Sequence, residues 1–267
     1  MPSNSTPSGT ATGAGKTPPK ADGMGGFAKG LKVIETFSTA MEPLTIAEVA
    51  QLTGLDRATS RRCILTLVNS GYALAEGRRF KLTPKVLLLS QSYLNASLPQ
   101  LLQPSLESLA EQLDESCSSA VLDGIDIIYI ARASRRRVMS INLNPGSRLP
   151  AYCTSMGRVL LANLAAEEAY DVLARSNRVP LTQHTITDID VLMKELERIR
   201  ASGYAIIDQE LETGLSSIAV PIRNTAGKTV AALNVGMQSS RAAKDKLTGT
   251  FLPLMLRVQN QLCEILH

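Results

Sequence analysis

The sequence predicts an α+β protein in two parts: a small N-terminal helical unit with a β-hairpin, and a larger domain built on a mostly antiparallel sheet. Three observations predict this class. Residues 45–71 have the pattern of two short helices joined by a glycine, and a hairpin pattern follows them. From residue 116 onward, strand patterns come in pairs with helical segments between them. The length of 267 residues is sufficient for two domains with their own cores.

The helix pair in residues 45–71 has clear start and stop signals. Thr45 and Glu48, three residues apart, form the pattern of a capping box. Gly54 is expected to end the first helix because glycine adopts positive φ freely, and Asp56 is expected to cap the second. The second helix is cationic in its first turns and apolar behind them. This is the arrangement of a recognition helix, whose N-terminal residues reach bases and phosphates in the major groove.

A hairpin with a cationic tip follows the helix pair. Residues 71–75 and 80–82 alternate like strands around a turn that contains Gly77. Such a hairpin is suited to contact backbone phosphates, so a winged helix-turn-helix is predicted. Its upstream packing helix is expected to present Phe27, Leu31, Ile34 and Phe37. The candidate DNA contacts are Thr45, Arg57, Thr59, Ser60, Arg61, Arg62, Arg78, Arg79 and Lys81.

The basic residues are concentrated in the part that contains the helix pair. Residues 1–90 carry 11 Lys and Arg against 6 Asp and Glu, whereas the rest carries 17 against 18. A phosphate-binding module requires this distribution, and its modest size indicates that tight DNA binding needs two copies. Residues 1–26 are rich in Ser, Thr, Gly and Pro and have no signal-peptide core, which predicts a disordered tail. The alternative is an arm that becomes ordered on DNA.

Cysteine and histidine usage argues against a metal site. Cys63, Cys117, Cys153 and Cys263 are far apart and the chain has two histidines, so we expect no metal and no cofactor. Unpaired thiols suit a reducing cytoplasm. No run of about 18 apolar residues is present, so no contact with a membrane is expected. We therefore predict a cytoplasmic protein.

The remaining elements are predicted in chain order. A helix over residues 85–97 is expected to connect the domains, with breaks at Pro99 and Pro104 and a second helix over 105–113. Strands are predicted at 118–122, 125–131, 138–143, 204–208, 218–223 and 229–235, and helices within 152–164 and over 167–175, 188–202 and 244–266. The run Arg135-Arg136-Arg137 is interpreted as a solvated hairpin tip, with contact to DNA or RNA polymerase as the alternative.

Several stretches, in the right order, resemble the IclR family of bacterial transcription regulators over roughly residues 27–265. Residues 55–67 look like its recognition helix, Gly71-Tyr72 and Tyr93-Leu94 like its linker, residues 146–162 like its effector loop, and residues 203–221 like its C-terminal signature. The effector loop is most similar to the branch that controls aromatic-acid and β-ketoadipate catabolism.

This resemblance implies a GAF-like effector-binding domain and a homodimer or dimer of dimers. The expected organisation is a tail (1–26), a winged helix-turn-helix (27–84), a linker helix (85–103) and an effector-binding domain (104–267). In relatives, effector contacts fall in the loop with Ser155 and Met156, near Asp208, and in the strand with Asn234 and Gly236. Ile207 stands where many relatives have an acidic residue, and Asp208 would face the opposite side of the strand. The orientation of Asp208 therefore stays open.

The chemistry of these residues suits a small carboxylate. A helix that begins near Arg158 offers backbone N–H groups, hydroxyls and an amide add hydrogen bonds, and Arg148 is a cation within reach. Each has an ordinary alternative role as a helix cap, core residue or solvated side chain. The candidate effector contacts are Tyr129, Arg148, Tyr152, Thr154, Ser155, Met156, Asp208, Leu215, Ser217, Asn234 and Gly236.

The sequence thus predicts a DNA-binding transcriptional regulator that binds a near-palindromic operator and a small organic acid, with RNA polymerase as a further candidate partner. An aromatic carboxylate such as 4-hydroxybenzoate or protocatechuate is the leading effector, and an aliphatic keto or dicarboxylic acid is the alternative. Two other functions are weighed. A thiol-dependent enzyme would use Cys153 with His184, but no nucleophile elbow or metal-ligand spacing is present, so no catalytic residue is predicted. A nonspecific architectural DNA-binding protein would leave the large non-basic domain unexplained.

Overall fold

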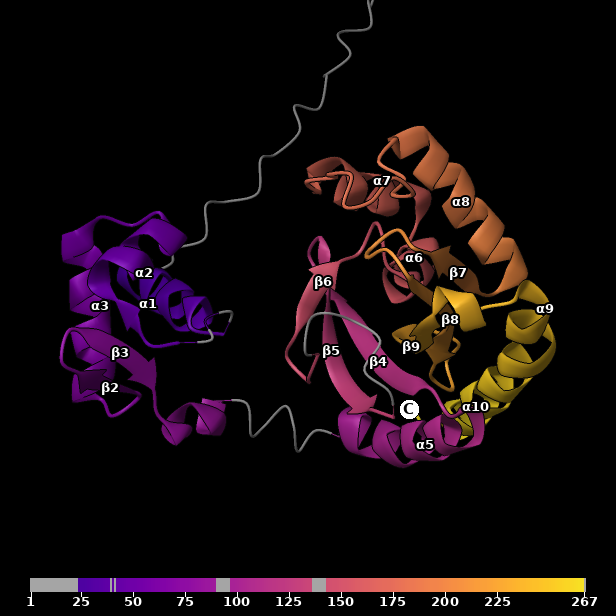
Figure 1. Ribbon diagram of the computed structural model, residues 1–267, viewed down its shortest axis with the longest axis horizontal. Helices are drawn as coiled ribbons and strands as arrows, with labels where there is room; N and C mark the ends of the chain where they lie inside the picture. Colours follow the sequence, from indigo (N-terminus) through magenta and orange to yellow (C-terminus); the bar gives the residue numbers. More distant parts are fainter. Residues whose placement is uncertain (1–23, 39, 41, 90–96, 136–142, 267) are drawn as a thin grey trace, which may run out of the picture. The chain divides into compact units, whose positions relative to one another are not determined.

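The computed structural model describes residues 24–38, 40, 42–89, 97–135 and 143–266 (Figure 1). The chain forms two compact units, residues 1–91 and residues 92–267. The first combines helices with a three-stranded sheet, and the second holds a six-stranded antiparallel sheet between two helical layers. The predicted α+β class is confirmed.

The N-terminal unit contains the predicted helix pair and hairpin. Its elements are α1 (Gly25–Thr36), β1 (Leu44–Thr45), α2 (Ile46–Thr53), α3 (Arg57–Asn69), β2 (Ala73–Glu76), β3 (Arg79–Leu82) and the 3-10 turn η1 (Pro84–Val86). The capping box is present, since the N–H of Thr45 donates to the Glu48 carboxylate at 2.7 Å and Thr45 Oγ1 accepts from the N–H of Glu48 at 3.3 Å. Gly54 ends α2 at φ +68°, and Asp56 caps α3 by accepting from the N–H of Thr59 at 2.8 Å.

The packing of α1 differs from the expectation. Val33 is fully buried and Phe37 nearly so, whereas Phe27 is 66% exposed and Leu31 is 42% exposed. Of the four expected packing residues, Ile34 and Phe37 therefore join Val33 in the core of this unit with α2, α3 and the hairpin, whereas Phe27 and Leu31 do not. The predicted tail lies outside the described residues up to residue 23, and α1 begins two residues before the expected start of the domain.

The C-terminal unit is one antiparallel sheet with the strand order β6-β5-β4-β9-β8-β7. The strands are β4 (Ser116–Asp123), β5 (Asp126–Ala133), β6 (Arg148–Pro150), β7 (Ala205–Asp208), β8 (Leu215–Arg223) and β9 (Thr229–Gln238). The helices are α5 (Ser97–Leu113), α6 (Ser155–Ala162), α7 (Ala166–Arg175), α8 (Ile189–Ser202), α9 (Lys244–Lys246) and α10 (Leu252–Ile265). The turn η2 (Ser239–Arg241) and the π-helical turn η3 (Leu247–Phe251) precede α10.

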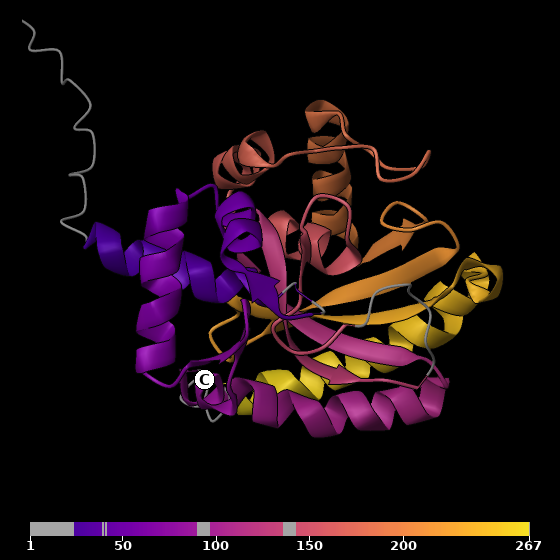
Figure 2. The ribbon, with the colours of Figure 1, turned by 60° about the vertical axis from the view of Figure 1, so that its left-hand side comes forward.

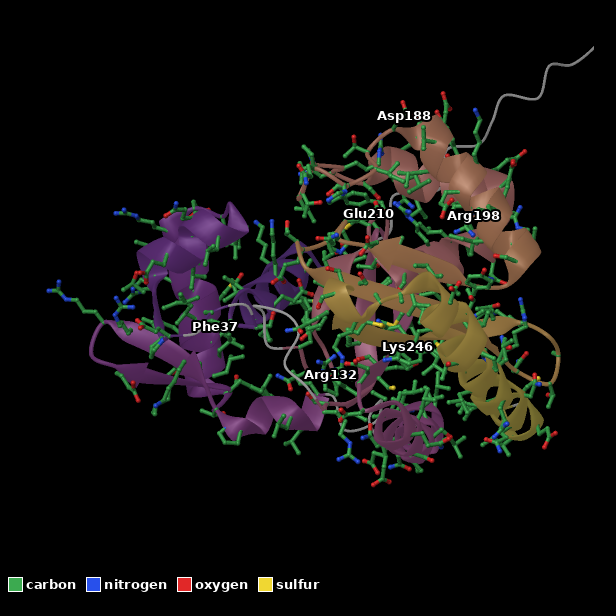
Figure 3. All side chains as sticks on the ribbon, turned by 45° about the vertical axis from the view of Figure 1, so that its right-hand side comes forward. Phe37, Arg132, Asp188, Arg198, Glu210 and Lys246 are labelled. Carbon is green, nitrogen blue, oxygen red and sulfur yellow. The ribbon has the colours of Figure 1, made fainter. Side chains whose placement is uncertain are left out.

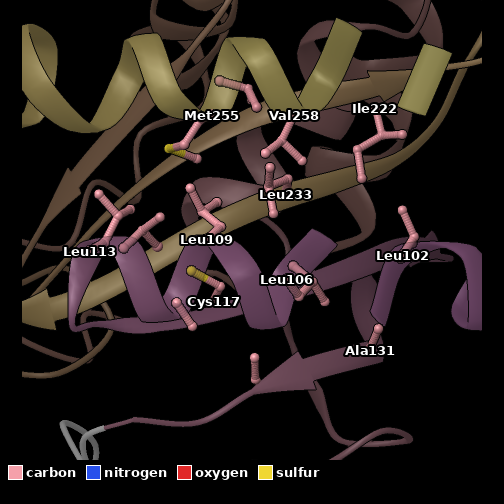
Figure 4. Packing of buried hydrophobic residues seen from close by; sticks show 14 of the residues in the cluster. Leu102, Leu106, Leu109, Leu113, Cys117, Ala131, Ile222, Leu233, Met255 and Val258 are labelled. Atoms are coloured by element: carbon pink, nitrogen blue, oxygen red, sulfur yellow. The ribbon is translucent and has the colours of Figure 1, made fainter. Parts of the chain in front are cut away.

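The two faces of this sheet carry separate cores, because side chains alternate along a strand. On one face, Cys117 and Leu233 pack against Leu106 and Leu109 of α5 and Met255 of α10 (Figure 4). The opposite face is covered by α6, α7 and α8 (Figures 1 and 2). Its strand positions are mostly small residues, which allow α6 to approach the sheet closely.

Two predicted segments differ from the structure, and a third lies largely outside the described residues. The helix α5 continues through Pro99 and Pro104, so the predicted boundary at residue 104 lies inside a helix whose Leu102 is fully buried in the C-terminal core. The final helix is interrupted by η3 just before Pro253, which has no N–H to continue an α-helical ladder. The strand predicted at 138–143 falls, apart from Leu143, outside the described residues.

Candidate functional site

The outer face of α3 carries three of the cations of the N-terminal unit. Arg57, Arg61 and Arg62 are exposed, whereas Ile64 and Leu67 are buried against the rest of the unit. The guanidinium of Arg62 donates to Thr59 Oγ1 at 3.3 Å. These three arginines form one cationic surface at the start of the helix, as a recognition helix requires.

Two expected DNA contacts on α3 need correction. Ser60 is fully buried, so its side chain cannot reach DNA, and its hydroxyl lies against the core of the unit. Thr59 is also buried, and its hydroxyl donates to Asp56 at 2.7 Å. Both residues complete the start of the helix, because their positions on the helical turn face inward. The sequence pattern indicates that these two residues are polar, but it does not indicate that their side chains point into the unit.

Some of the expected DNA contacts on the hairpin and at Thr45 are occupied by contacts within the protein, and one is free to contact DNA. Arg79 donates to the carbonyl of Pro43 at 2.6 Å and lies 3.7 Å from the Glu48 carboxylate, so it ties the hairpin to α2. Lys81 forms an ion pair with Glu76, and the Thr45 hydroxyl is used in the capping box. Among the described residues, Arg78 has no ion-pair partner. It is therefore the best-placed phosphate contact of the hairpin.

The C-terminal unit contains a pocket between the sheet and the first turn of α6. The space between its atoms amounts to about 560 Å³, a value that includes the part open to solvent. It brings together most of the predicted effector contacts, which come from β5, β8, β9 and the start of α6. The lining residues are Ser116, Tyr129, Arg132, Leu143, Cys153, Thr154, Ser155, Met156, Ile207, Leu211, Leu215, Ser217, Asn234 and Gly236.

The strand register explains which side chains share the pocket face. Ser118 is the register partner of both Arg132 on β5 and Asn234 on β9, so these three residues form one row across the sheet. Partners in a row share a face, and the guanidinium of Arg132 donates to Ser118 Oγ at 2.9 Å. This row places Arg132 and Asn234, which both line the pocket, on the same face of the sheet.

A β-bulge decides that Arg132 belongs to this face. The register shifts between Ser119 and Ala120, so that Tyr129 pairs with Ala120 while Arg132 pairs with Ser118. An unbroken strand would place residues three apart on opposite faces. Because of the extra residue, Tyr129 and Arg132 both line the pocket. Sequence reasoning missed Arg132, although a single arginine in the apolar stretch of β5 is itself a signal.

The first turn of α6 forms the other polar border. Thr154 caps the helix by accepting from the N–H of Gly157 at 3.2 Å, and all eight residues of α6 are buried. The N–H groups at the start of an α-helix have no intrahelical acceptor and carry partial positive charge. Ser217 Oγ on β8 donates to Ser155 Oγ at 2.9 Å, so a pair of hydroxyls lies beside this helix end.

The electrostatics of the pocket favour an anion. Burial lowers the pKa of Arg132, which shows that its charged form is incompletely solvated, and the described residues include no carboxylate ion-paired with it. None of the lining residues is acidic. Burial also raises the pKa of Tyr129 to about 12, so its phenol stays protonated at neutral pH and is able to donate a hydrogen bond.

Three predicted effector contacts lie outside the pocket lining. The side chain of Arg148 is bound by two carboxylates at the β4–β5 turn, including Asp126 at 3.2 Å. The hydroxyl of Tyr152 donates to the carbonyl of Val179 at 2.7 Å, so this buried ring serves the packing around α6. Asp208 is exposed and accepts from Ser216, while Ile207 faces the pocket, as strand alternation requires.

Six lining residues were absent from the sequence-based set. The cation Arg132 is the most consequential of them, and Leu211 reaches the pocket from the β7–β8 loop, a position that no strand pattern indicates. The six are Ser116, Arg132, Leu143, Cys153, Ile207 and Leu211.

The thiol of Cys153 lines the pocket but is not activated. Burial raises its pKa to about 12, so it is protonated at neutral pH, whereas a nucleophilic cysteine has a lowered pKa. His184 is exposed and its ring lies 3.2 Å from the amide of Gln183. The geometry therefore gives no support to the thiol-dependent enzyme.

Two kinds of feature are absent from the part of the chain that the structure describes. No group of three or more His, Cys, Asp or Glu side chains is arranged to hold a metal ion. Among the described helices, none has the length and apolar character needed to cross a membrane.

Two family models match the chain. The model described as IclR helix-turn-helix domain matches residues 27–76, and the model described as bacterial transcriptional regulator IclR C-terminal matches residues 91–264. Between them they include the cationic face of α3 and every residue of the pocket.

Similar proteins include two regulators whose names refer to the Pca regulon and to p-hydroxybenzoate hydroxylase. The Pca regulon regulatory protein of Pseudomonas putida is 43% identical over 244 residues, which are 91% of this chain and 84% of that protein. The p-hydroxybenzoate hydroxylase transcriptional activator of Acinetobacter baylyi is 36% identical, over 90% of this chain and 91% of that protein. A solved inducer-binding domain of PobR from Acinetobacter, a double mutant in complex with 3-hydroxybenzoic acid, is 33% identical with a TM-score of 0.60. That similarity covers 63% of this chain and 98% of the solved domain.

Proposed function

This chain belongs to the IclR family of bacterial transcriptional regulators, in the branch of the Pca and p-hydroxybenzoate regulators, and we propose that its C-terminal unit binds a small aromatic carboxylate. The observation that carries this proposal is the position of Arg132. Its guanidinium borders a pocket without acidic lining residues and has no carboxylate partner among the described residues. A ligand carboxylate supplies the missing charge, and hydrogen bonds between charged groups are the stronger class.

The remaining walls of the pocket suit an aromatic ring. Between the polar borders lie Tyr129, Met156, Leu211 and Leu215, which offer an apolar surface and a sulfur atom to a ring face or edge. The similar regulators are named for Pca and p-hydroxybenzoate genes, and the similar solved domain holds 3-hydroxybenzoic acid. We therefore favour 4-hydroxybenzoate or protocatechuate, with the ring hydroxyl directed to the polar groups opposite Arg132.

A second ligand class follows from the two polar borders. Arg132 lies on the β5 side, while the N-terminus of α6 and the Ser155–Ser217 hydroxyl pair lie on the β8 side. A helix N-terminus binds anions as well as hydroxyl oxygens. An aliphatic keto or dicarboxylic acid would place one carboxylate at each border, and it is the alternative ligand.

The N-terminal unit is proposed to read a near-palindromic operator as part of a homodimer or dimer of dimers. Two copies of α3 would enter successive major grooves, and Arg78 would contact phosphate. The exposed apolar side chains of α1, including Phe27 and Leu31, border a groove shared with α3. Exposed apolar surface of this kind marks an interaction site, and we propose a second copy of the chain as its occupant.

Regulation then requires the acid to prefer one arrangement of the DNA-reading units. A ligand shifts an equilibrium between two states only by its difference in affinity for them. We also propose that the promoter-bound protein contacts RNA polymerase.

A thermal-shift panel tests the ligand proposal. We expect 4-hydroxybenzoate or protocatechuate at 100 times its Kd to raise the melting temperature by about 5–10 °C, since binding only to the native state adds about 2.7 kcal/mol. Benzamide analogues, which lack the carboxylate, are the control and should give no shift. A shift with succinate or a keto acid, and none with the aromatic acids, would identify the alternative class.

Replacing Arg61 with alanine tests the DNA-reading proposal. We expect operator affinity to fall about tenfold, because one charge-assisted contact to a base or phosphate is lost. If the contact is to phosphate, the slope of log affinity against log salt concentration should also become shallower by about one, because one fewer counterion is released. Electrophoretic mobility shift across a salt series measures both, and Arg175→Ala, at an exposed residue of α7, is the control. Equal operator affinity in the two variants would refute the assignment of α3.

A further inference from the structure

A buried ion pair lies behind the pocket without touching it. Arg158 of α6 is 1% exposed and donates to the Glu210 carboxylate at 2.6 Å, and neither residue lines the pocket. Glu210 belongs to the β7–β8 loop, residues 209–214, so the pair joins α6 to that loop. The pair links two walls of the pocket without a ligand, since α6 provides Ser155 and Met156 and the loop provides Leu211.

Both partners of the pair hold additional backbone groups. Arg158 Nε donates to the carbonyl of Tyr152 at 2.8 Å, which fixes the segment that leads into α6. The Glu210 carboxylate also accepts from the N–H of Ile186 at 2.9 Å, which belongs to the long α7–α8 loop. One carboxylate oxygen therefore connects α6, the β7–β8 loop and the α7–α8 loop (Figure 3 labels Glu210).

Threonines of the α7–α8 loop complete the attachment of the β7–β8 loop. Thr182 Oγ1 donates to the carbonyl of Gln209 and Thr185 Oγ1 donates to the carbonyl of Glu210, both at 2.6 Å. Gln209 has a positive φ of 58°, a conformation that a non-glycine residue adopts only when its surroundings hold it. The loop that carries Leu211 is thus fixed from outside the pocket by polar contacts.

We propose that Arg158 and Glu210 are positioning residues that shape the ligand pocket by clamping the β7–β8 loop onto α6. They act through Leu211 and through the first turn of α6, without contact to the ligand. This inference rests on the proposed ligand-binding function of the pocket and extends it to residues outside the lining. The same loop joins β7 to β8, so the clamp also connects the pocket with the edge of the sheet.

The cost of burying this pair supports a role beyond stability. Desolvation of two charges offsets much of their attraction, and apolar pairs of similar volume often give equal stability. An ion pair with ideal hydrogen bonds, however, fixes direction and distance as an apolar contact does not. What the charged pair adds here is a single arrangement of three segments around the pocket.

The test compares the full-length protein with a double variant, Arg158→Met with Glu210→Leu, which removes both charges and keeps the packed volume. We expect a folded protein whose affinity for 4-hydroxybenzoate, measured by calorimetry, is about tenfold weaker. Hydrogen exchange in the ligand-free protein should become faster throughout residues 209–215. A milder variant, Thr182→Val with Thr185→Val, leaves the ion pair intact and should give smaller changes in the same direction.

A matched control exists on the same unit. Arg198 and Glu195 on α8 form a two-bond ion pair of the same residue types, at 2.9 and 2.6 Å, and Arg198 is exposed (Figure 3). Arg198→Met with Glu195→Leu should leave both affinity and exchange at 209–215 unchanged. The inference would be overturned if the folded Arg158–Glu210 variant showed wild-type affinity for 4-hydroxybenzoate and wild-type hydrogen exchange at residues 209–215, whether or not the threonine variant did the same. Should the wild-type protein bind neither 4-hydroxybenzoate nor protocatechuate, the proposed ligand class is wrong, while exchange at 209–215 still decides whether the clamp exists.

Discussion

Replacing Arg132 with methionine is expected to weaken binding of an aromatic carboxylate about 100-fold, which corresponds to about 2.8 kcal/mol. Methionine keeps an apolar stem but lacks the guanidinium, and with it the charge and the hydrogen-bond donors. The described lining of the pocket offers no other cation, so the ligand carboxylate would lose its counter-charge. Calorimetric titration with 4-hydroxybenzoate measures the change.

The same substitution should change the stability of the ligand-free protein little, since relief from burying an unpaired charge opposes the loss of the hydrogen bond to the buried Ser118 hydroxyl. Burial lowers the pKa of Arg132, so the folded state disfavours its charged form, and no carboxylate in the described residues offsets this. A group whose folded-state pKa is lowered in this way, and which is charged at neutral pH, opposes folding there. Loss of affinity without loss of melting temperature would separate a ligand contact from a structural role.

Arg148→Met is the matched control for this prediction. The sequence placed Arg148 near the effector, but the structure binds it to Asp123 and Asp126 away from the pocket. We expect its affinity for 4-hydroxybenzoate to equal that of the wild type. The corresponding amide, 4-hydroxybenzamide, should bind the wild type and Arg132→Met with nearly equal affinity. The reverse result, with Arg148→Met weak and Arg132→Met unchanged, would place the carboxylate elsewhere.

Replacing Gly157 with alanine is expected to destabilise the C-terminal unit by about 3 kcal/mol or more. A Cβ at this position would lie 2.2 Å from the carbonyl oxygen and 2.4 Å from the Cα of Ala151. Both are backbone atoms, so no side-chain rotation relieves the overlap, and α6 must move away from residue 151. The melting temperature should fall by about 10 °C, as measured by circular dichroism.

The displacement should also impair the pocket, since Gly157 lies in the first turn of α6 beside Ser155 and Met156. Gly249→Ala is a suitable control in the same unit, because a Cβ there has no atom within 4 Å. It should leave both stability and ligand binding nearly unchanged. A Gly157→Ala protein with wild-type melting temperature would show that α6 does not pack as closely as described.

Local chemistry made the N-terminal unit largely predictable. The capping box of Thr45 and Glu48, the glycine stop at Gly54 and the Asp56 cap depend on contacts within three or four residues, and all are present. What could not be predicted was which polar residues of α3 face inward. Ser60 lies in a turn with Arg57, Thr59 and Arg61, which are also polar, and only packing against the unit's core turns it away from solvent.

The pocket was predictable in its helix and central strands but not at its edges. Thr154 and Ser155 were found because a loop-to-helix junction is visible in sequence, and Ser217 and Asn234 because their strands were recognised. Leu211 was not predicted because it lies in a loop, and the path of this loop is set by contacts with Arg158, Thr182 and Thr185. These partners lie 25 to 52 residues away in the chain.

The sequence by itself determined the α+β class, the cationic reading helix and the family, because each depends on local patterns or on ordered stretches of residues. Only the tertiary structure decided the charge of the pocket. The bulge between Ser119 and Ala120 turns Arg132 to the same face as Tyr129, and strand alternation alone places these two on opposite faces. The physical reason is that a bulge depends on pairing between strands, so the orientation of Arg132 is fixed by its partner strand and not by its neighbours in the chain.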